Sequence, residues 1–238
     1  RPESWNGISD VEVLGDSVYN YTYNTLSELL EQDLAPSIVQ IGNEINGNIL
    51  IERTSQSIDA SSPGLFTIAW SRPVNLLHKG IQAVNKVNSD YGTEIKTLIH
   101  VAQPENATWW FADATEKGLT DYDIIGISYY PEWSDYGLRE VGEHVAFMTQ
   151  TYNKAVMIVE TGYPWTFSHA DGAGNVLGWD SRLETFENQF SIDIQKDFMT
   201  ELTYLVKTNG GSGVIYWEPA WVSSDCETYW GKGSHFDN

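Results

Sequence analysis

The feature that most constrains this chain is a pair of short, largely apolar runs that each end in a glutamate. Residues 38–41 lead into Gly42, Asn43 and Glu44, and residues 155–159 lead into Glu160. Such runs of apolar, mostly β-branched residues are typical of strands buried on both faces, as in a parallel sheet. Taken singly, each glutamate can also be read as a solvated carboxylate in the loop after a strand.

Helical patterns alternate with strand-like runs along the rest of the chain. The predicted strands are the run that ends at Glu44 and residues 95–101, 124–130, 155–160 and 214–217. The predicted helices cover residues 16–30, 71–91, 106–117, 138–152 and 185–208. Regular alternation of this kind predicts βα units in a parallel sheet, within one α/β domain.

The charge of the chain limits its partners. Thirty-three acidic and thirteen basic residues give a formal net charge of −20. Such a surface repels nucleic acid, anionic lipid and anionic polymers such as polygalacturonate, and it favours a neutral substrate. No segment reaches transmembrane length. The single cysteine, Cys226, cannot form an internal disulfide.

Aromatic side chains make up 13% of the sequence, and many of them fall in predicted loops. About half are expected in the core. Flat rings on the wall of a cleft suit the apolar faces of sugar rings. The loop candidates are Trp109, Trp110, Tyr129, Tyr130, Trp133, Tyr136, Trp165, Trp217, Trp221 and Trp230.

Polar and aromatic side chains gather where the predicted strands end. In chain order they are Asn43 and Glu44, His100, Tyr129 and Tyr130, Glu160, and Trp217 and Glu218. In a barrel of parallel strands the carboxyl ends open onto one face, so these residues are expected to converge. Two carboxylates there can divide the cleavage of a glycosidic bond. The structural alternatives are a turn residue for Asn43, a core residue for Tyr129 and barrel packing for Trp217.

Several motifs resemble those of the retaining (β/α)8 glycosidases, which carry Asn-Glu after the fourth strand and Glu after the seventh. Among these the chain resembles the endo-β-1,4-galactanases (arabinogalactan endo-β-1,4-galactanases) of glycoside hydrolase family 53. The motifs run through nearly the whole chain and are VQIGNEING at 39–47, GISYYP at 126–131, VETGYPW at 159–165, YWEPAW at 216–221 and WGKGS at 230–234.

The resemblance implies a role for each residue of the candidate site. Glu44 is expected to be the general acid/base and Glu160 the nucleophile, with carboxyl groups about 5–5.5 Å apart. Asn43 is expected to contact the sugar 2-hydroxyl, Tyr129 to support Glu160, and Trp217 to stack on the sugar. The remaining substrate-binding candidates are His100, Trp165 and Glu218.

The implied activity is retaining endo-hydrolysis of β-1,4-galactan, the neutral side chain of pectin, with no required cofactor. A monomeric protein that is secreted, periplasmic or held at the cell surface is expected. Two alternatives remain open. One is another retaining glycosidase of the same clan, such as a mannanase, xylanase or β-glucanase. The other is a non-catalytic carbohydrate-binding fragment.

The length of the chain departs from the family pattern. Only 43 residues precede Glu44, which closes the fourth strand in such a barrel. We therefore expect one catalytic (β/α)8 domain over residues 1–238, holding about the third or fourth strand to the eighth, and incomplete at both ends. Residues 234–238 resemble a segment that continues into a last helix.

The loop after Glu160 contains candidate calcium ligands. Some members of the family bind calcium there, and carboxylate and amide oxygens suit that ion. Asp171 and Asn175 are candidate ligands for a structural calcium site, with His169 and Asp180 nearby and Ala173 where another acidic ligand is expected. The alternative is a solvated glycine-rich loop.

Overall fold

The computed structural model describes residues 2–51, 68–166, 177, 190–217, 227–228 and 231–232. Five strands form one sheet in the order β1-β2-β3-β4-β5. β1 runs parallel to β2, and β4 runs parallel to β5. The chain forms two compact units, one of residues 1–101 and 108–125 and the other of residues 102–107 and 126–238. The expectation of a single catalytic domain stays a prediction.

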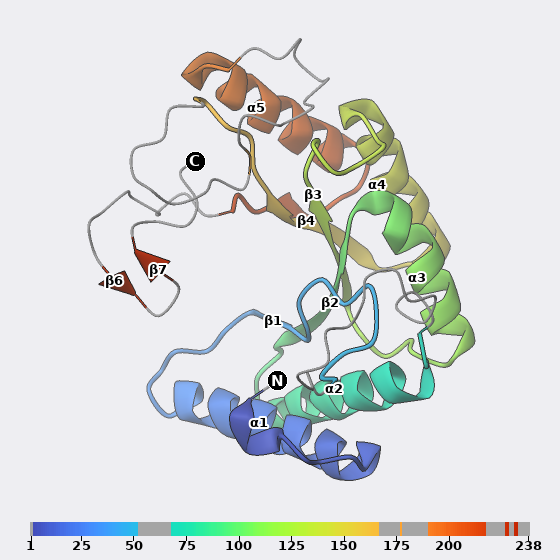
Figure 1. The fold of residues 1–238 in the computed structure, drawn as a ribbon, viewed down its shortest axis with the longest axis vertical. Helices are drawn as coiled ribbons and strands as arrows, with labels where there is room; N and C mark the ends of the chain where they lie inside the picture. The colour runs from blue at the N-terminus through green and yellow to red at the C-terminus, as the bar shows by residue number, and fades with distance from the viewer. Residues whose placement is uncertain are drawn as a thin grey trace. The chain divides into compact units, whose positions relative to one another are not determined.

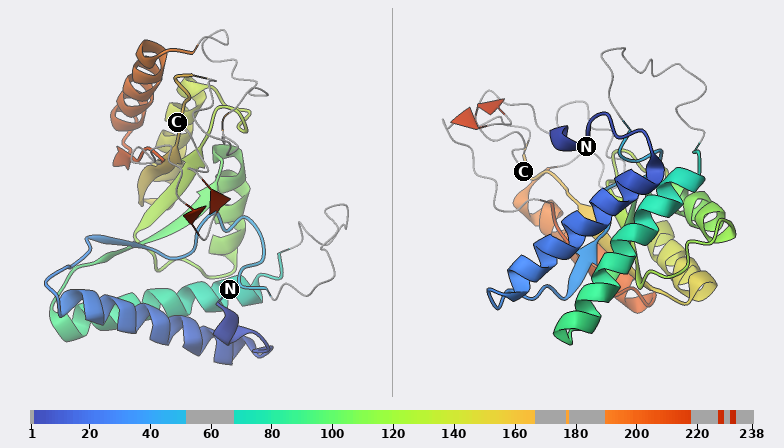
Figure 2. Two further views of the ribbon diagram at one scale, coloured as in Figure 1. Left: turned by 60° about the vertical axis from the view of Figure 1, so that its left-hand side comes forward. Right: turned by 90° about the horizontal axis from the view of Figure 1, so that it is seen from below.

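The first unit is built on two long helices, α1 (Val11–Leu30) and α2 (Ser71–Tyr91). They lie side by side, as Figures 1 and 2 show. α1 begins five residues earlier than predicted, because the Asp10 carboxylate accepts hydrogen bonds from the backbone N–H groups of Glu12 and Val13 and so caps the helix. α2 ends at Gly92 as predicted, since this residue adopts a left-handed conformation with φ of 70°. A 3₁₀ turn, η1 (Glu3–Trp5), precedes α1.

The strands of the first unit differ in burial. β1 (Ile38–Gln40) pairs with β2 (Lys96–Ala102), with Val39 opposite Thr97. Thr97 to Val101 are all buried, whereas Ile38 and Gln40 are exposed. Within the described residues β1 stands at the end of the strand order, so it has a strand partner on one side only. An apolar groove of about 610 Å³ is lined by residues of α1, α2 and β1 and by residues 41–45 and 47–50.

The second unit repeats the βα pattern. β3 (Ile124–Tyr129) is buried throughout and is followed by α4 (Leu138–Tyr152), β4 (Ala155–Thr161), α5 (Ile192–Thr208) and β5 (Gly213–Val214). α4 and α5 pack against each other (Figure 1). Helix α3 (Pro104–Glu116) connects β2 to β3.

Some boundaries in the second unit differ from those predicted. α5 begins at Ile192, because the Ser191 hydroxyl accepts the N–H of Ile194, and residues 185–189 of the predicted helix lie outside the described residues. The pairing of β5 with β4 continues to Trp217, whose N–H donates to the carbonyl of Thr161. A short antiparallel pair, β6 (Glu227–Thr228) and β7 (Gly231–Lys232), was not predicted. Among the described helices, none is both long and apolar enough to span a membrane.

The exposed edge of β1 generates a prediction about the 238-residue chain expressed alone. Unpaired strand edges promote association, and each apolar side chain left exposed costs roughly 1.5–3 kcal/mol of a net stability of about 5–15 kcal/mol. We expect the chain to self-associate in sedimentation velocity. Ile38→Lys, which places a charge on the edge, is expected to shift the population toward monomer. Tyr204→Lys, at an exposed position of α5, is the control. A parent chain that is monomeric and melts cooperatively would contradict the prediction.

A second prediction concerns acid stability and rests on His144 in α4. This ring is 6% exposed, and its Nε2 has no hydrogen-bond partner among the described residues. Burial lowers the pKa of His144 from 6.5 to about 4. As the pH falls below about 6.5, the unfolded chain takes up a proton that the folded protein resists, so stability is full above that pH and is lost toward about pH 4.

The loss assigned to His144 is up to about 3 kcal/mol, from the difference between the two pKa values. Urea unfolding at about pH 7 and about pH 4.5, in the Ile38→Lys background to suppress association, measures it. His144→Phe is expected to remove this contribution and to leave that of His100, whose pKa burial also lowers to about 4. His78→Gln is the control, because the His78 side chain is 31% exposed and pairs with Asp121 at the surface. Equal pH dependence in the parent and in His144→Phe would refute the assignment.

Candidate active site

The first predicted glutamate lies in a tight turn directly after β1. Gly42 has φ of +86°, and a side chain there would meet Ile45 Cγ2 at 2.6 Å. Glu44 itself has φ of +47°, a left-handed conformation that is uncommon for a residue other than glycine. Strained backbone of this kind persists only where neighbouring groups hold it, and it clusters at functional sites. The Glu44 side chain is exposed.

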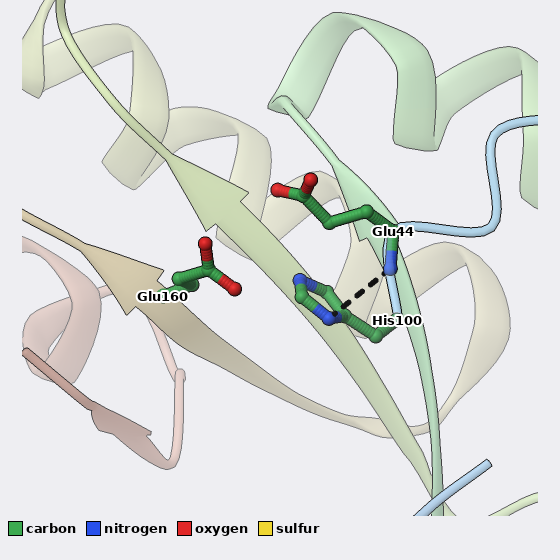
Figure 3. Close-up of side chains that lie close together, drawn as sticks. All are labelled: Glu44, His100 and Glu160. Carbon is green, nitrogen blue, oxygen red and sulfur yellow. Dashed lines mark hydrogen bonds between the residues drawn. The ribbon is translucent and has the colours of Figure 1, made fainter. Parts of the chain in front are cut away.

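Strand β2 holds this turn through His100. The His100 carbonyl accepts the N–H of Ile45 at 3.0 Å. The ring Nδ1 lies 3.4 Å from the backbone N–H of Glu44, as the dashed line in Figure 3 marks, and 3.2 Å from Asn43 Oδ1. Asn43 Oδ1 also accepts from Gln40 Nε2 at 3.0 Å. The Asn-Glu pair is therefore located by β1 and β2 together.

The imidazole of His100 is almost completely buried, at 1% exposure. Burial lowers its pKa to about 4, so the ring is neutral over most of the acidic and neutral range. A neutral ring nitrogen serves either as a donor or as an acceptor. In this structure the ring meets the Asn-Glu pair, and direct binding of substrate by His100 stays a prediction.

The second predicted glutamate ends the buried strand β4. Glu160 is half-buried, and Figure 3 shows it at the carboxyl end of its strand. The Tyr130 hydroxyl donates a hydrogen bond to Glu160 Oε1 at 3.0 Å. The next residue, Thr161, is fully buried and donates from its hydroxyl to the carbonyl of Tyr129 at 2.6 Å. Tyr129 at the end of β3 and Tyr130 directly after it therefore contact both residues at the end of β4.

The structure corrects the sequence prediction for Tyr129. Its hydroxyl donates to the carbonyl of Tyr136 at 2.9 Å and not to Glu160. The ring is fully buried and stacks on Phe198 of α5, with centroids 6.4 Å apart. The reason is the alternation of side chains along a strand, which directs neighbours to opposite faces. Tyr129 faces the helix, and Tyr130 meets the carboxylate of Glu160.

Two residues that were not among the predicted site residues position Tyr130. Gln103, with φ of +65°, accepts the N–H of Tyr130 on its Oε1 at 3.3 Å and donates its own N–H to the carbonyl of Ser128 at 3.0 Å. Gly162 leaves room for the ring, because a side chain there would come within 3.3 Å of Tyr130 Cε1. The sequence signal for both was their place two residues after the end of a predicted strand.

The predicted loop aromatics have different surroundings. Trp133 is 51% exposed and packs on Tyr130, with ring centroids 5.0 Å apart. Trp165 is exposed, and Trp217 is half-buried with its backbone tied to the end of β4. Trp110 is fully buried and so belongs to the core. The candidates that lie outside the described residues are His169, Asp171, Asn175, Asp180, Glu218, Trp221 and Trp230.

Comparison with known proteins connects these residues to a family. Residues 1–238 match the sequence model of glycosyl hydrolase family 53. An arabinogalactan endo-beta-1,4-galactanase of Cellvibrio japonicus is 47% identical over 237 residues, covering 100% of this chain and 61% of the relative. The chain thus spans about three fifths of the length of that relative.

Solved structures agree with the fold described above. The GH53 catalytic domain of Ignisphaera aggregans superposes with a TM-score of 0.81 at 29% identity, over 98% of this chain and 62% of that one. A fungal beta-1,4-galactanase gives a TM-score of 0.73 at 28% identity, over 92% of this chain and 62% of that one. The predicted fold class, part of a (β/α)8 barrel, is confirmed. The chain belongs to glycosyl hydrolase family 53.

Proposed function

We propose that this chain carries the catalytic pair of a retaining endo-β-1,4-galactanase, with β-1,4-galactan or the side chains of type I arabinogalactan as substrate. The observation that carries the proposal is the placement of two glutamates at strand ends. Glu44 follows Asn43 in the turn after β1. Glu160 lies at the end of β4 and accepts a hydrogen bond from the Tyr130 hydroxyl. The 47% identical relative bears the name of that activity.

Convergence of the two carboxylates follows from the family fold. In a (β/α)8 barrel the carboxyl ends of all strands open onto one face, where residues from separate strands meet. β1 and β4 belong to one sheet, and each glutamate lies at or just beyond the carboxyl end of its strand. We therefore assign Glu44 and Glu160 to one active site, with the carboxyl separation of about 5–5.5 Å that retaining enzymes use.

The two carboxylates then divide the reaction. Glu160 attacks the anomeric carbon and forms a glycosyl ester while Glu44 gives its proton to the departing glycosidic oxygen. In the second step Glu44 takes a proton from water as that water displaces Glu160, which leaves as a carboxylate. Two displacements at one carbon restore the original configuration, and both glutamates return to their starting protonation states.

The neighbouring residues supply binding and charge. The hydrogen bond from Tyr130 favours the ionised form of Glu160, as a nucleophile requires. Asn43 is assigned to the sugar 2-hydroxyl, a contact that strengthens in the transition state. Trp217 is assigned as the stacking floor for the reacting sugar, and Trp165 and Glu218 as further contacts. Calcium at Asp171 and Asn175 stays a prediction.

The charge of the chain fits a neutral polysaccharide better than an anionic one. Its net charge of −20 repels nucleic acid and polygalacturonate but not galactan. Because a polymer of this size does not enter cells intact, we place the enzyme outside the cytoplasmic membrane, as a secreted, periplasmic or surface-held protein. We expect the whole protein to be a monomer.

Two alternatives are separated by one set of assays. Another retaining glycosidase would release reducing sugar from mannan, xylan or β-glucan in preference to galactan. A non-catalytic fragment would bind galactan without cleaving it, and the exposed edge of β1 favours this outcome for the 238-residue chain alone. Reducing-sugar release measured for this chain and for a form with upstream βα units distinguishes the cases.

The assignment of roles generates a prediction about azide rescue. Glu160→Ala is expected to abolish turnover, and azide is expected to restore it by entering the vacated space and forming an α-glycosyl azide, because a single displacement inverts the β-configuration. In Glu44→Ala, rescue is expected only with substrates whose leaving group needs no proton. The anomeric configuration of the azide products, read by NMR, reports which residue was replaced. If Glu44→Ala gave the pattern expected of Glu160→Ala, the two roles would be interchanged.

The contact with Tyr130 generates a prediction about pH. A protonated acid and an ionised nucleophile give a bell-shaped profile of kcat/KM, whose limbs belong to the coupled pair. Tyr130→Phe removes a hydrogen bond that favours the charged form of Glu160, so the acidic limb is expected to move toward higher pH and kcat to fall.

The matched control for Tyr130→Phe is Tyr129→Phe. This change removes the hydrogen bond to Tyr136, which costs about 1 kcal/mol of stability, and it should leave the acidic limb in place. If Tyr129→Phe moved the acidic limb and Tyr130→Phe did not, the role assigned from the structure would be refuted.

A further inference from the structure

We infer that His100 is a positioning residue that holds Asn43 and Glu44 through its ring Nδ1, and that it acts through these two residues and not by contact with the sugar. The inference rests on the proposed function, in which Asn43 contacts the sugar 2-hydroxyl and Glu44 is the general acid/base. The turn at residues 42–45, together with Gln40 and the His100 ring, is called the Asn-Glu clamp below.

The backbone of Glu44 needs support that its own turn does not provide. Its φ of +47° is strained for a side chain with a Cβ, and the preceding Gly42 is left-handed as well. His100 meets both peptide groups that flank Glu44. Its main-chain carbonyl accepts the N–H of Ile45, and its ring Nδ1 faces the N–H of Glu44. One residue of β2 thus holds the strained conformation on both sides.

The same ring nitrogen also reaches the side chain of Asn43. Nδ1 lies 3.2 Å from Asn43 Oδ1, which accepts a second hydrogen bond from Gln40 Nε2 at 3.0 Å. Gln40 stands opposite Leu98 in the ladder, so side-chain alternation puts Gln40 on the face that Leu98 and His100 share. Two strands therefore direct one polar group each at the amide of Asn43.

A neutral imidazole can serve both contacts through its two tautomers. With the proton on Nδ1 the ring donates to Asn43 Oδ1, and with the proton on Nε2 it leaves Nδ1 to accept from the N–H of Glu44. A doubly protonated ring can still donate to Asn43 Oδ1 but can no longer accept from the N–H of Glu44. The burial that lowers the pKa of His100 to about 4 keeps both tautomers available at higher pH.

Loss of the Asn-Glu clamp is expected to make the rate depend on the leaving group of the substrate. A loss of core packing alone does not have this effect. A misplaced Glu44 protonates the leaving oxygen poorly, so the rate falls most for substrates with basic leaving groups. Activated aryl galactobiosides need little proton transfer and are affected less. A change that merely lowers stability reduces the amount of active enzyme, and the rate then falls equally for all substrates.

The test compares three replacements of His100 in the full-length protein. In His100→Asn the amide lies near the position of Nδ1, in His100→Gln it lies near the position of Nε2, and His100→Phe keeps a ring without nitrogen. Leu98→Ala is the packing control, since Leu98 is buried on the same strand and the same face. Rates are measured on galactan and on dinitrophenyl and phenyl β-galactobiosides.

We expect His100→Phe and His100→Gln to lower kcat/KM on galactan by about 100-fold, the scale of general acid catalysis, with a much smaller loss on the dinitrophenyl substrate. His100→Asn is expected to stay within about tenfold of the parent on both substrates, because it retains a polar group near the Nδ1 position. Leu98→Ala should show no dependence on the leaving group. Equal losses for the Asn and Phe replacements, or losses independent of the leaving group, would overturn the inference.

A second readout does not depend on activity. Amide hydrogen exchange over residues 41–46, followed by mass spectrometry, is expected to be faster in His100→Phe than in His100→Asn. Equal exchange in these two variants would overturn the inference. If the parent protein failed to cleave galactan while exchange still separated the variants, the proposed function would fail and the clamp would stand.

Discussion

The register of β1 against β2 is the constraint on which the Glu44 half of the site depends. Val39 lies opposite Thr97, the N–H of Ile41 donates to the carbonyl of Leu98, and the N–H of Ile45 donates to that of His100. The ladder thus continues on both sides of the strained turn that carries Glu44. A slip of one residue would reverse which face each side chain of β1 occupies and separate Asn43 and Glu44 from His100.

The same alternation governs the half of the site that carries Glu160. In β4, Val156, Ile158 and Glu160 share one face, and Thr161 lies on the other. Tyr129, the last residue of β3, and Tyr130, which follows it, divide in the same way. Tyr129 stacks against Phe198 and bonds to Tyr136, while Tyr130 bonds to Glu160. Of two adjacent residues at a strand end, one thus contributes to the candidate active site and the other to the core.

Much of this fold could be predicted because its signals are local. The bounds of α4 and the glycine that ends α2 followed directly from apolar periodicity and from known helix stop signals. The start of α1 was predicted too late because the apolar pattern was counted from Val18, whereas the cap at Asp10 and the buried Leu14 place the first turn earlier. The two glutamates were recognisable because each follows an apolar run within a family-specific motif.

The remaining features depend on side-chain direction and backbone conformation, which the residue types alone do not indicate. Two adjacent tyrosines after an apolar run look equivalent until it is known which of them faces the helix. In the structure Tyr129 faces the helix, and Tyr130 therefore lies beside Glu160. The clamp by His100 depends on a left-handed backbone at Glu44, which a sequence pattern does not mark. Gln103 is a comparable case, since its side chain acts on a backbone N–H of the neighbouring strand.

The central claim is that Glu44 and Glu160 act as one catalytic pair. A crystal structure of the full-length protein tests it most directly, through the distance between the two carboxyl groups. We predict a separation of about 5–5.5 Å, as retaining glycosidases require. A separation beyond about 7 Å in an undistorted structure would place the pair in the range of inverting enzymes and contradict the assignment.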